Sequence, residues 1–331
     1  MRRTPHQILL ATLVASVAIS LFAVEQGTAL ILSALAVYAV IAALGVWSMR
    51  LALFGPTYCV PPRTHRQAIA LTFDDGPDPA LTPDVLDVLG RYDIRATFFL
   101  IGEKVRAHPD LVRRIDAGGH TIGSHDLRHG VASNFRLKDS FISDIGASLA
   151  AIHAVTGRTP ALYRPPVGLT NPQLLAALDH LGLYCIGWNR SVRDAGNRRL
   201  HRIERLPDLA RGGTVAILHD VLPRPEAREL YLERLEALCR RIRDLRLHAC
   251  SVDEVFGLPA YTEQAGRTED PGRGQPAVSG TGSGAPDGTC APAQPPSRRE
   301  KPRRMPTPLR HAASLSQRPA SGAGPPPSPP R

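Results

Sequence analysis

Two adjacent carboxylates, Asp74 and Asp75, stand at the end of an apolar run and just before a Gly-Pro turn. Acids side by side are costly to keep ionised unless a cation or a proton separates their roles. Further along the chain, His125 and His129 have the i, i+4 spacing that places two rings on one face of a helical turn, close enough to share one ion. One carboxylate with both histidines makes a three-ligand site with an open fourth position, which is typical of catalytic zinc.

The segments between these groups predict the elements that position them. From about Ala68 onward, short apolar runs alternate with amphipathic stretches, which favours a parallel α/β sheet, closed or nearly closed, of about six or seven strands. The predicted strands cover residues 69–73, 96–101, 120–124, 161–163, 183–188 and 214–218. The predicted helices cover residues 82–92, 110–117, 141 to about 157, 172–181 and 226–245.

Polar residues follow the ends of several of these predicted strands. They are Asp74, Asp75, His125, Arg164, Asp194 and His219. In a parallel α/β barrel the carboxyl ends of the strands meet at one rim, where active sites are built. We therefore expect these side chains to lie in one cleft.

Five segments, in this order, resemble the five motifs of the polysaccharide deacetylase family (carbohydrate esterase family 4, the NodB-homology domain). They are residues 72–77 (TFDDGP), 125–129 (HDLRH), 164–168 (RPPVG), 188–194 and 218–220 (LHD). The resemblance covers residues 66–256 and implies a distorted (β/α)7 barrel-like domain. It also implies a metal-dependent hydrolase that cleaves the N-acyl amide of an amino sugar.

The resemblance gives each polar residue a role. It implies that Asp74 is the general base and that Arg164 orients it. It implies likewise that His219 is the general acid and that Asp194 orients it. The implied ligands of one divalent metal are Asp75, His125 and His129. Zinc is the expected metal, with cobalt, nickel or manganese as alternatives.

The implied substrate pocket is less like the family than the catalytic residues are. Its residues are Pro166, Val167, Trp188 and Leu218. An aromatic residue is more usual in the family where Val167 stands, although a backbone N–H remains available there for an oxyanion. The sequence also departs from the family pattern at Asp126, at Gly130 and in the spacing of Trp188 and Asp194. These departures bear on substrate choice more than on the reaction.

Two uncharged apolar runs, residues 8–24 and 29–47, precede the predicted domain. One continuous helix over both would be about 60 Å long, twice the hydrocarbon thickness of a bilayer, so two transmembrane helices in a hairpin are favoured. A cleaved signal peptide is the alternative for the first run, but no clear small-x-small cleavage site follows it. Basic residues flank the outer ends: Arg2, Arg3, Arg50, Arg63 and Arg66. The positive-inside rule then predicts an inner-membrane protein with a cytoplasmic catalytic domain, with a periplasmic domain as the alternative.

The remaining composition describes the ends of the chain. We expect a membrane segment over residues 1–50, a linker over 51–65, the deacetylase domain over 66–258 and a tail over 259–331. The tail is rich in Pro, Gly, Ser and Arg and has too few large apolar residues to fold, so it is predicted to be disordered. About half of the formal net charge of +10 lies there. For its basic cluster at residues 298–304 we expect a solvated tail, with contact to anionic lipid or RNA as the alternative.

Composition and motifs also limit the classes of partner and the covalent cross-links that we expect. Aromatic residues make up 5% of the chain, and no zinc-finger, RNP-like or helix-turn-helix pattern is present, so no nucleic-acid partner is expected. The five cysteines are scattered without a CxxC pair and form no disulfide framework.

The sequence therefore predicts a membrane-anchored amidase that removes an acyl group, acetyl or formyl, from an N-acylated glycan or a lipid-linked amino sugar. Its expected partners are that glycan and membrane lipid. A periplasmic deacetylase of peptidoglycan or exported polysaccharide is the nearest alternative. A membrane-anchored glycan-binding module without activity is a second alternative, although a binder has no need of the acidic and histidine residues above.

Overall fold

The computed structural model describes residues 4–22, 27–62, 67–130, 136–191, 200–209, 213–222 and 224–262, together with residues 65, 134 and 194. The predicted disordered tail from residue 263 onward, with its basic cluster and Cys290, lies outside the described residues, as do residues 23–24 of the first predicted span.

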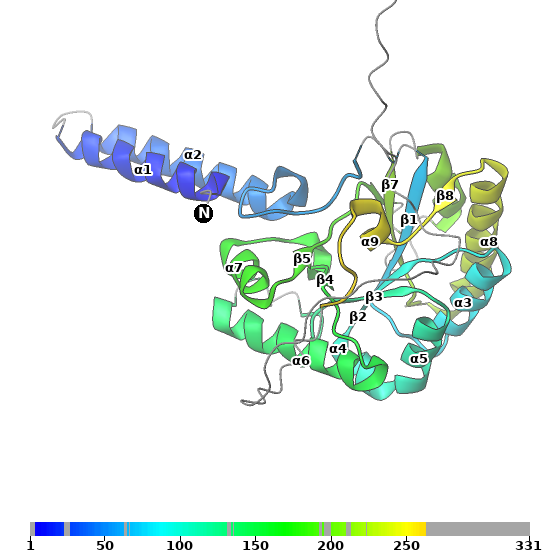
Figure 1. Ribbon diagram of the computed structural model, residues 1–331. Helices are drawn as coiled ribbons and strands as arrows, with labels where there is room; N and C mark the ends of the chain where they lie inside the picture. The colour runs from blue at the N-terminus through cyan, green and yellow to red at the C-terminus, as the bar shows by residue number, and fades with distance from the viewer. Residues whose placement is uncertain are drawn as a thin grey trace, which may run out of the picture. The chain divides into compact units, whose positions relative to one another are not determined.

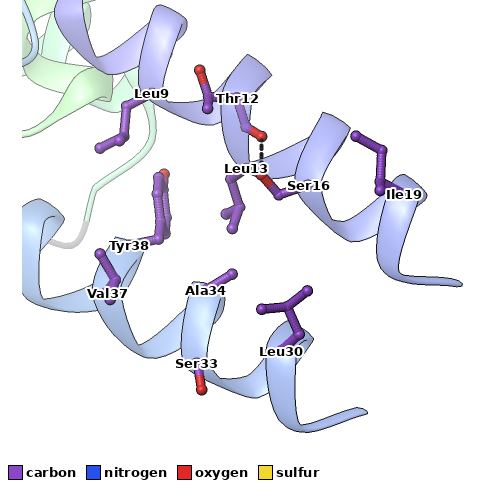
Figure 2. A pocket seen from close by; sticks show the side chains of 10 residues that line it. All are labelled: Leu9, Thr12, Leu13, Ser16, Ile19, Leu30, Ser33, Ala34, Val37 and Tyr38. Carbon is purple, nitrogen blue, oxygen red and sulfur yellow. Dashed lines mark hydrogen bonds between the residues drawn. The ribbon is translucent and has the colours of Figure 1, made fainter. Parts of the chain in front are cut away.

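The two apolar runs form two helices, α1 (Pro5–Phe22) and α2 (Gly27–Trp47), which lie side by side (Figure 1). In the described part of the chain, α2 is long and apolar enough to cross a membrane, whereas residues 5–19 of α1 form a shorter apolar helix. The His6 ring lies 3.0 Å from the Tyr38 hydroxyl, a hydrogen bond that joins the two helices near the start of α1. A cleft of about 450 Å³ lies between the helices (Figure 2). Its lining is apolar except for a few hydroxyl groups: Leu9, Thr12, Leu13, Ser16, Ile19, Leu30, Ser33, Ala34, Val37 and Tyr38.

A parallel sheet forms the centre of the domain (Figure 1). Its strands are β1 (Ala68–Asp74), β2 (Thr97–Leu100), β3 (Thr121–Ser124), β4 (Leu162–Tyr163), β5 (Tyr184–Cys185), β6 (Arg190–Ser191), β7 (Thr214–His219) and β8 (His248–Ala249). The order is β5-β4-β3-β2-β1-β7-β6, and β8 pairs with the start of β1. Each predicted strand has a counterpart here. The sequence did not predict β6 and β8, because two-residue strands that contain Arg190 or His248 carry no apolar run.

One stretch of chain connects the two edges of this sheet. Its beginning, β5, pairs with β4, and its end, β6, pairs with β7. Between them the Asn189 N–H donates to the Val215 carbonyl. The sheet therefore bends round into a distorted barrel, as the family resemblance implied. The segment from β5 to β6 closes it, because its two ends pair with opposite edges of the sheet.

Helices cover the outside of the sheet. They are α3 (Thr82–Arg91), α4 (Gly102–Ala107), α5 (Pro109–Ala117), α6 (Lys138–Thr156), α7 (Pro172–Leu181) and α8 (Arg228–Asp244), with 3-10 segments η1 (Met49–Leu51), η4 (Pro166–Gly168), η6 (Leu200–Leu209) and η7 (Pro225–Ala227). The short helix α9 (Val252–Phe256) packs instead on the other face of β1, where its Val252 and Val255 join Ala68 and Ala70. The sequence missed α4, α9 and η6, since α4 and α9 are too short to show a helical period and η6 is not an α-helix.

Side chains of the central strand β1 alternate between two environments. Ile69, Leu71 and Phe73 pack in a cluster with buried residues of α3 and α8. Ala68 and Ala70 belong to a separate inner cluster that includes Phe99 and Ile186. By the same alternation Thr72 and Asp74 face inward, which places a carboxylate at the carboxyl end of the strand on the inner side of the sheet.

The folded chain continues past the predicted domain end at residue 258. The Ala161 N–H donates to the Ala260 carbonyl, and Tyr261 pairs with Pro160. The Tyr261 hydroxyl also accepts from the Ile122 N–H, and the Arg158 guanidinium lies 4.2 Å from the Tyr261 ring centroid. Residues 259–262 therefore belong to the domain, because the Tyr261 side chain and two backbone contacts fix them to it.

Candidate active site

Asp74 lies at the end of β1 and is 2% exposed. Its Oδ1 accepts a hydrogen bond of 2.6 Å from Nη1 of Arg164, which is itself fully buried. Arg164 also donates to the Thr72 hydroxyl and to the carbonyls of Ile186 and Gly187. These bonds satisfy the guanidinium in several directions, so Arg164 has one orientation and holds the Asp74 carboxylate in one place.

Asp75 turns out of the strand with a φ of 72°. This left-handed conformation ends the strand alternation, so that Asp75 faces the same imidazole as Asp74 does. The His125 Nε2 lies 4.0 Å from Asp74 Oδ2 and 3.4 Å from Asp75 Oδ1. Both carboxylates therefore border one site, as the adjacent acids in the sequence suggested.

The two histidines come from the loop after β3, not from a helical turn. The loop has left-handed residues at Asp126, with a φ of 63°, and at His129, with a φ of 51°. The expectation of one helix face was wrong, because these two residues curl the chain back on itself. The rings still converge, with centroids 5.0 Å apart, and His129 Nε2 lies 3.2 Å from Asp75 Oδ1.

These three side chains fit a divalent cation. One ligand atom from each of Asp75, His125 and His129 lies within 4.8 Å of the others. Asp75 Oδ1 is buried and has no hydrogen-bond partner among the described residues, as expected of an atom reserved for a ligand. His125 Nδ1 lies 2.7 Å from the Arg164 carbonyl, so Nδ1–H donates there and Nε2 keeps its lone pair for the metal.

Electrostatics at Asp75 and His129 also suit a cation, whereas at His125 burial is outweighed by the neighbouring carboxylates of Asp74 and Asp75, which raise the pKa of the imidazole. Burial works to raise the pKa of the Asp75 carboxyl, but the close His125 ring and the charges of His125, His129 and His219 hold that pKa well below its usual range. Burial lowers the pKa of His129, and the neighbouring His125 charge adds to this effect although Asp75 opposes it. An ionised carboxylate beside an imidazole that favours its neutral form is the ligand state that metals require.

His219 stands at the end of β7, directly beside Asp74 in the register. Its Nδ1 lies 3.2 Å from Asp194 Oδ1, and its backbone N–H donates to Asp194 Oδ2 at 2.9 Å. Burial opposes the charged imidazole, but the hydrogen bond and charge of Asp194 outweigh it and raise the pKa of His219 to about 9. The structure thus brings Asp194 to His219 despite the unusual motif spacing, and leaves Nε2 free of that carboxylate.

Two residues of this site had no assigned role in the sequence analysis. Lys104 of α4 donates from Nζ to the Asp75 carbonyl at 2.7 Å. Asp220 is fully buried and accepts from the Thr82 hydroxyl at 2.6 Å, and burial raises the pKa of its carboxyl to about 7. A Cβ added at Gly76 would lie 2.3 Å from Asp220 Oδ2, so the turn after Asp75 rests on this carboxylate. Asp220 directly follows His219 and closes the fifth motif, residues 218–220, which was the signal available in the sequence.

The predicted pocket residues divide into two groups. Val167 lies in η4 with a φ of 60° and is 56% exposed. Next to it a Cβ on Gly168 would lie 2.3 Å from Trp188 Cη2, so the half-buried indole packs directly against the turn that contains Pro166. Leu218 lies elsewhere: it is fully buried in the cluster between the sheet and the helices, on the strand face opposite to His219.

Comparisons with known proteins agree with this geometry. The sequence profile of the polysaccharide deacetylase family matches residues 62–186 of this chain. The chain is 36% identical over 163 residues to a chitooligosaccharide deacetylase from Bradyrhizobium sp. (strain ANU 289). The matched region covers 49% of this chain and 74% of that protein. It is 35% identical over 167 residues to a peptidoglycan-N-acetylglucosamine deacetylase from Bacillus cereus, which spans 50% of this chain and 76% of that protein.

A solved structure shares both the fold and part of the sequence. It is a family 4 acetyl xylan esterase from Clostridium thermocellum in complex with a cobalt ion. The two chains are 31% identical with a TM-score of 0.52, over 59% of this chain and 94% of that one. The likeness covers the barrel-like domain.

Proposed function

This chain belongs to the polysaccharide deacetylase family, and we propose that it is a metal-dependent amidase that removes the acetyl group from an N-acetylated amino sugar. The observation that carries the proposal is the convergence of Asp74, His219 and the Asp75-His125-His129 group on one rim of the barrel. The two relatives named above act on chitooligosaccharides and peptidoglycan. N-acetylglucosamine units are therefore the first substrates to test.

Asp75, His125 and His129 would hold the metal, for which zinc is expected and cobalt, nickel or manganese are alternatives. When bound there, a divalent cation polarises the acyl carbonyl and acidifies the attacking water. Asp74 accepts the proton of that water on Oδ2, because Arg164 occupies Oδ1. Its position beside His125 keeps the base next to the metal ligands.

His219 supplies the proton that the leaving group needs. At neutral pH its imidazole is charged, since Asp194 raises its pKa to about 9 despite burial. As the C–N bond breaks, Nε2–H is donated to the amine nitrogen, and Asp194 holds Nδ1–H throughout. The products are a free amine and acetate. The Val167 N–H, which makes no backbone hydrogen bond in the described chain, is our proposed donor to the oxyanion.

We further propose that α2 anchors the enzyme in a membrane. Its length and composition suit a span, and Trp47 at its end is 76% exposed, as is typical of an aromatic residue at the bilayer interface. The basic residues near the outer ends of the hairpin favour a cytoplasmic domain in a bacterial-type inner membrane. A reporter fused after Thr262 that is active only in the cytoplasm is the expected result. A fusion active only in the periplasm would reverse this topology.

The activity itself is tested with the full chain in detergent or nanodiscs. We expect zinc- or cobalt-dependent release of acetate from N-acetylglucosamine oligomers, and no release by the Asp75→Ala variant. Parallel assays with N-formyl and lipid-linked amino sugars define the acyl group and the carrier. A folded, metal-loaded protein that releases neither acid from any of these substrates would refute the amidase and favour a glycan-binding module.

A further inference from the structure

The chain that leaves α2 is packed into the catalytic domain. Met49 and Cys59 are buried in a core cluster that also contains Tyr163 and Cys185. The Tyr58 N–H donates to the Cys185 carbonyl, so this part of the predicted linker adds to the edge of β5. The proposed membrane helix is therefore joined to the domain by a structured connection over residues 48–59.

The end of α2 and this connection make direct contacts with both segments that form the predicted pocket. The Thr170 N–H and Oγ1 donate to the carbonyls of Val46 and Gly45, each at 3.2 Å. Arg50 Nη2 donates to the Asn189 carbonyl at 2.6 Å. We call these five residues the juxtamembrane clamp. Thr170 follows the turn that contains Val167, and Asn189 follows Trp188, so the clamp holds each pocket segment at its end.

The same connection also packs behind the buried arginine of the site. A Cβ added at Gly187 would lie 2.5 Å from Cys59 Sγ and 3.3 Å from Met49 Cε. The carbonyl of Gly187 accepts a hydrogen bond of 3.0 Å from Arg164 Nη2. Movement of the segment that follows α2 would therefore reach the peptide that positions Arg164 as well as the pocket walls.

Exposed apolar side chains gather around the clamp. Trp47 is 76% exposed at the end of α2, and Leu51 and Val167 are each 56% exposed. Leu137 is 72% exposed and precedes Lys138, whose N–H donates to Gln173 Oε1 close to Thr170 in the chain. Trp47 ends α2 and Leu51 follows it in η1, so the bilayer that α2 enters is the occupant that would cover these apolar side chains.

We propose that the juxtamembrane clamp is a positioning element of the substrate pocket, and that it fixes the pocket at the bilayer surface so that the enzyme acts on an amino sugar attached to a membrane lipid. This inference rests on the proposed deacetylase activity and narrows its substrate class. The pocket wall lies within one helical turn of the end of α2, because Thr170 contacts Gly45 and Val46 directly. A sugar at the level of the lipid headgroups meets this wall without leaving the membrane surface.

The test uses the full chain in vesicles of phosphatidylethanolamine and phosphatidylglycerol. Two substrates are compared: a soluble N-acetylglucosamine tetramer, and N-acetylglucosamine linked to a diacylglycerol in the same vesicles. With lipid-linked sugar expressed as bulk concentration, we expect kcat/KM to exceed that for the tetramer by about tenfold or more, because the anchor and its substrate share one surface. Equal values would overturn the proposal and leave the deacetylase intact. Release from neither substrate would refute the deacetylase itself.

The clamp is tested by a double variant, Thr170→Val with Arg50→Met, which keeps side-chain volume and removes two hydrogen bonds. We expect KM to rise about three- to tenfold for each bond on both substrates, with kcat and the melting temperature little changed. Arg50→Lys, which keeps a donor for the Asn189 carbonyl, should restore part of the loss. Leu245→Ala, an exposed apolar residue at the end of α8, is the matched control and should change neither constant. A fall in kcat without a rise in KM would overturn the positioning role.

Discussion

Asp74 and Asp75 are neighbours in the chain, yet they lie in opposite surroundings. Asp74 is buried, paired with Arg164 and fixed by a network that reaches Thr72 and Gly187. The Asp75 side chain is 28% exposed, and its Oδ1 meets two imidazoles without a hydrogen bond among the described residues. We call the first group the inner half of the site and the second, with His129 and His219, the outer half.

The difference separates what the fold completes from what it leaves for a ligand. In the inner half every charge has a partner within the protein, so its geometry is set before anything binds. In the outer half the side chains of His129 and His219 are 27% and 18% exposed. Oδ1 of Asp75 has no hydrogen-bond partner among the described residues, which leaves it available to a cation. We infer that the inner half supplies a pre-oriented base and that the outer half receives metal and substrate.

The largest expected effects, on kcat and on zinc affinity, come from replacing each aspartate in turn by asparagine. Asp74→Asn should lower kcat by about 10²- to 10⁴-fold while zinc still binds, because a general base contributes that much and is not a ligand. Asp75→Asn should weaken zinc affinity by more than about 100-fold, since even outer-shell partners of metal ligands contribute 10- to 100-fold. Calorimetric titration with zinc and acetate release distinguish the two. Equal loss of zinc binding in both variants would remove the distinction between the halves.

The next largest effect is expected on the free energy of unfolding, when a charged partner is removed from the inner half. Arg164→Met leaves the Asp74 carboxylate buried without its partner, which should lower the free energy of unfolding by about 3–5 kcal/mol. Urea unfolding followed by tryptophan fluorescence measures this change. Removal of an outer-half side chain, as in His129→Ala, should cost much less in the same assay, because that ring is partly exposed. Similar losses for both would contradict the idea that only the inner half is built into the fold.

Much of the fold and of the candidate site could be predicted from the sequence. The adjacent acids, the histidine pair and the strand ends were visible as residue types beside apolar runs, and the family motifs gave their order. The strands themselves were predicted because buried parallel strands read as continuous apolar segments, as in residues 69–73. Family membership and the barrel-like fold are confirmed by the comparisons.

What the sequence did not show depends on backbone geometry and on contacts between distant segments. The histidine loop was taken for a helical turn, because spacing alone does not reveal left-handed residues such as Asp126 and His129. Lys104 contacts the backbone of Asp75, a bond that no side-chain motif can encode. Leu218 was placed in the pocket by resemblance, although strand alternation puts it on the face opposite to His219. The roles of the catalytic residues stay predictions until the variants above are measured.

The pH dependence sharpens the account of the outer half. His219 is charged below about pH 9, because Asp194 raises its pKa despite burial, so activity that needs this acid should fall as pH rises through that region. Asp194→Asn should lower this pKa and move the alkaline limb of kcat/KM to lower pH. The Asp194–His219 interaction also stabilises the fold fully only below the unfolded pKa of about 6.5, and its contribution is lost as pH rises through about 9. The variant should therefore lose more stability at pH 6 than at pH 10, and an unchanged alkaline limb would exclude His219 as the acid.

The smallest effect is expected in the turn that borders the pocket, where two neighbouring residues behave differently. Val167 is β-branched, exposed and held at a φ of 60°, a conformation that costs such a residue about 1–3 kcal/mol. Val167→Gly should relieve this strain but increase the entropy of the unfolded chain, for a net gain below about 1 kcal/mol. Gly168→Ala is the matched opposite, because its Cβ would lie 2.3 Å from Trp188 Cη2, and it should destabilise the domain. If this turn is shaped for binding, Val167→Gly will raise KM while the melting temperature stays level or rises. A variant that keeps its KM would show that the strain at Val167 serves no part of substrate binding.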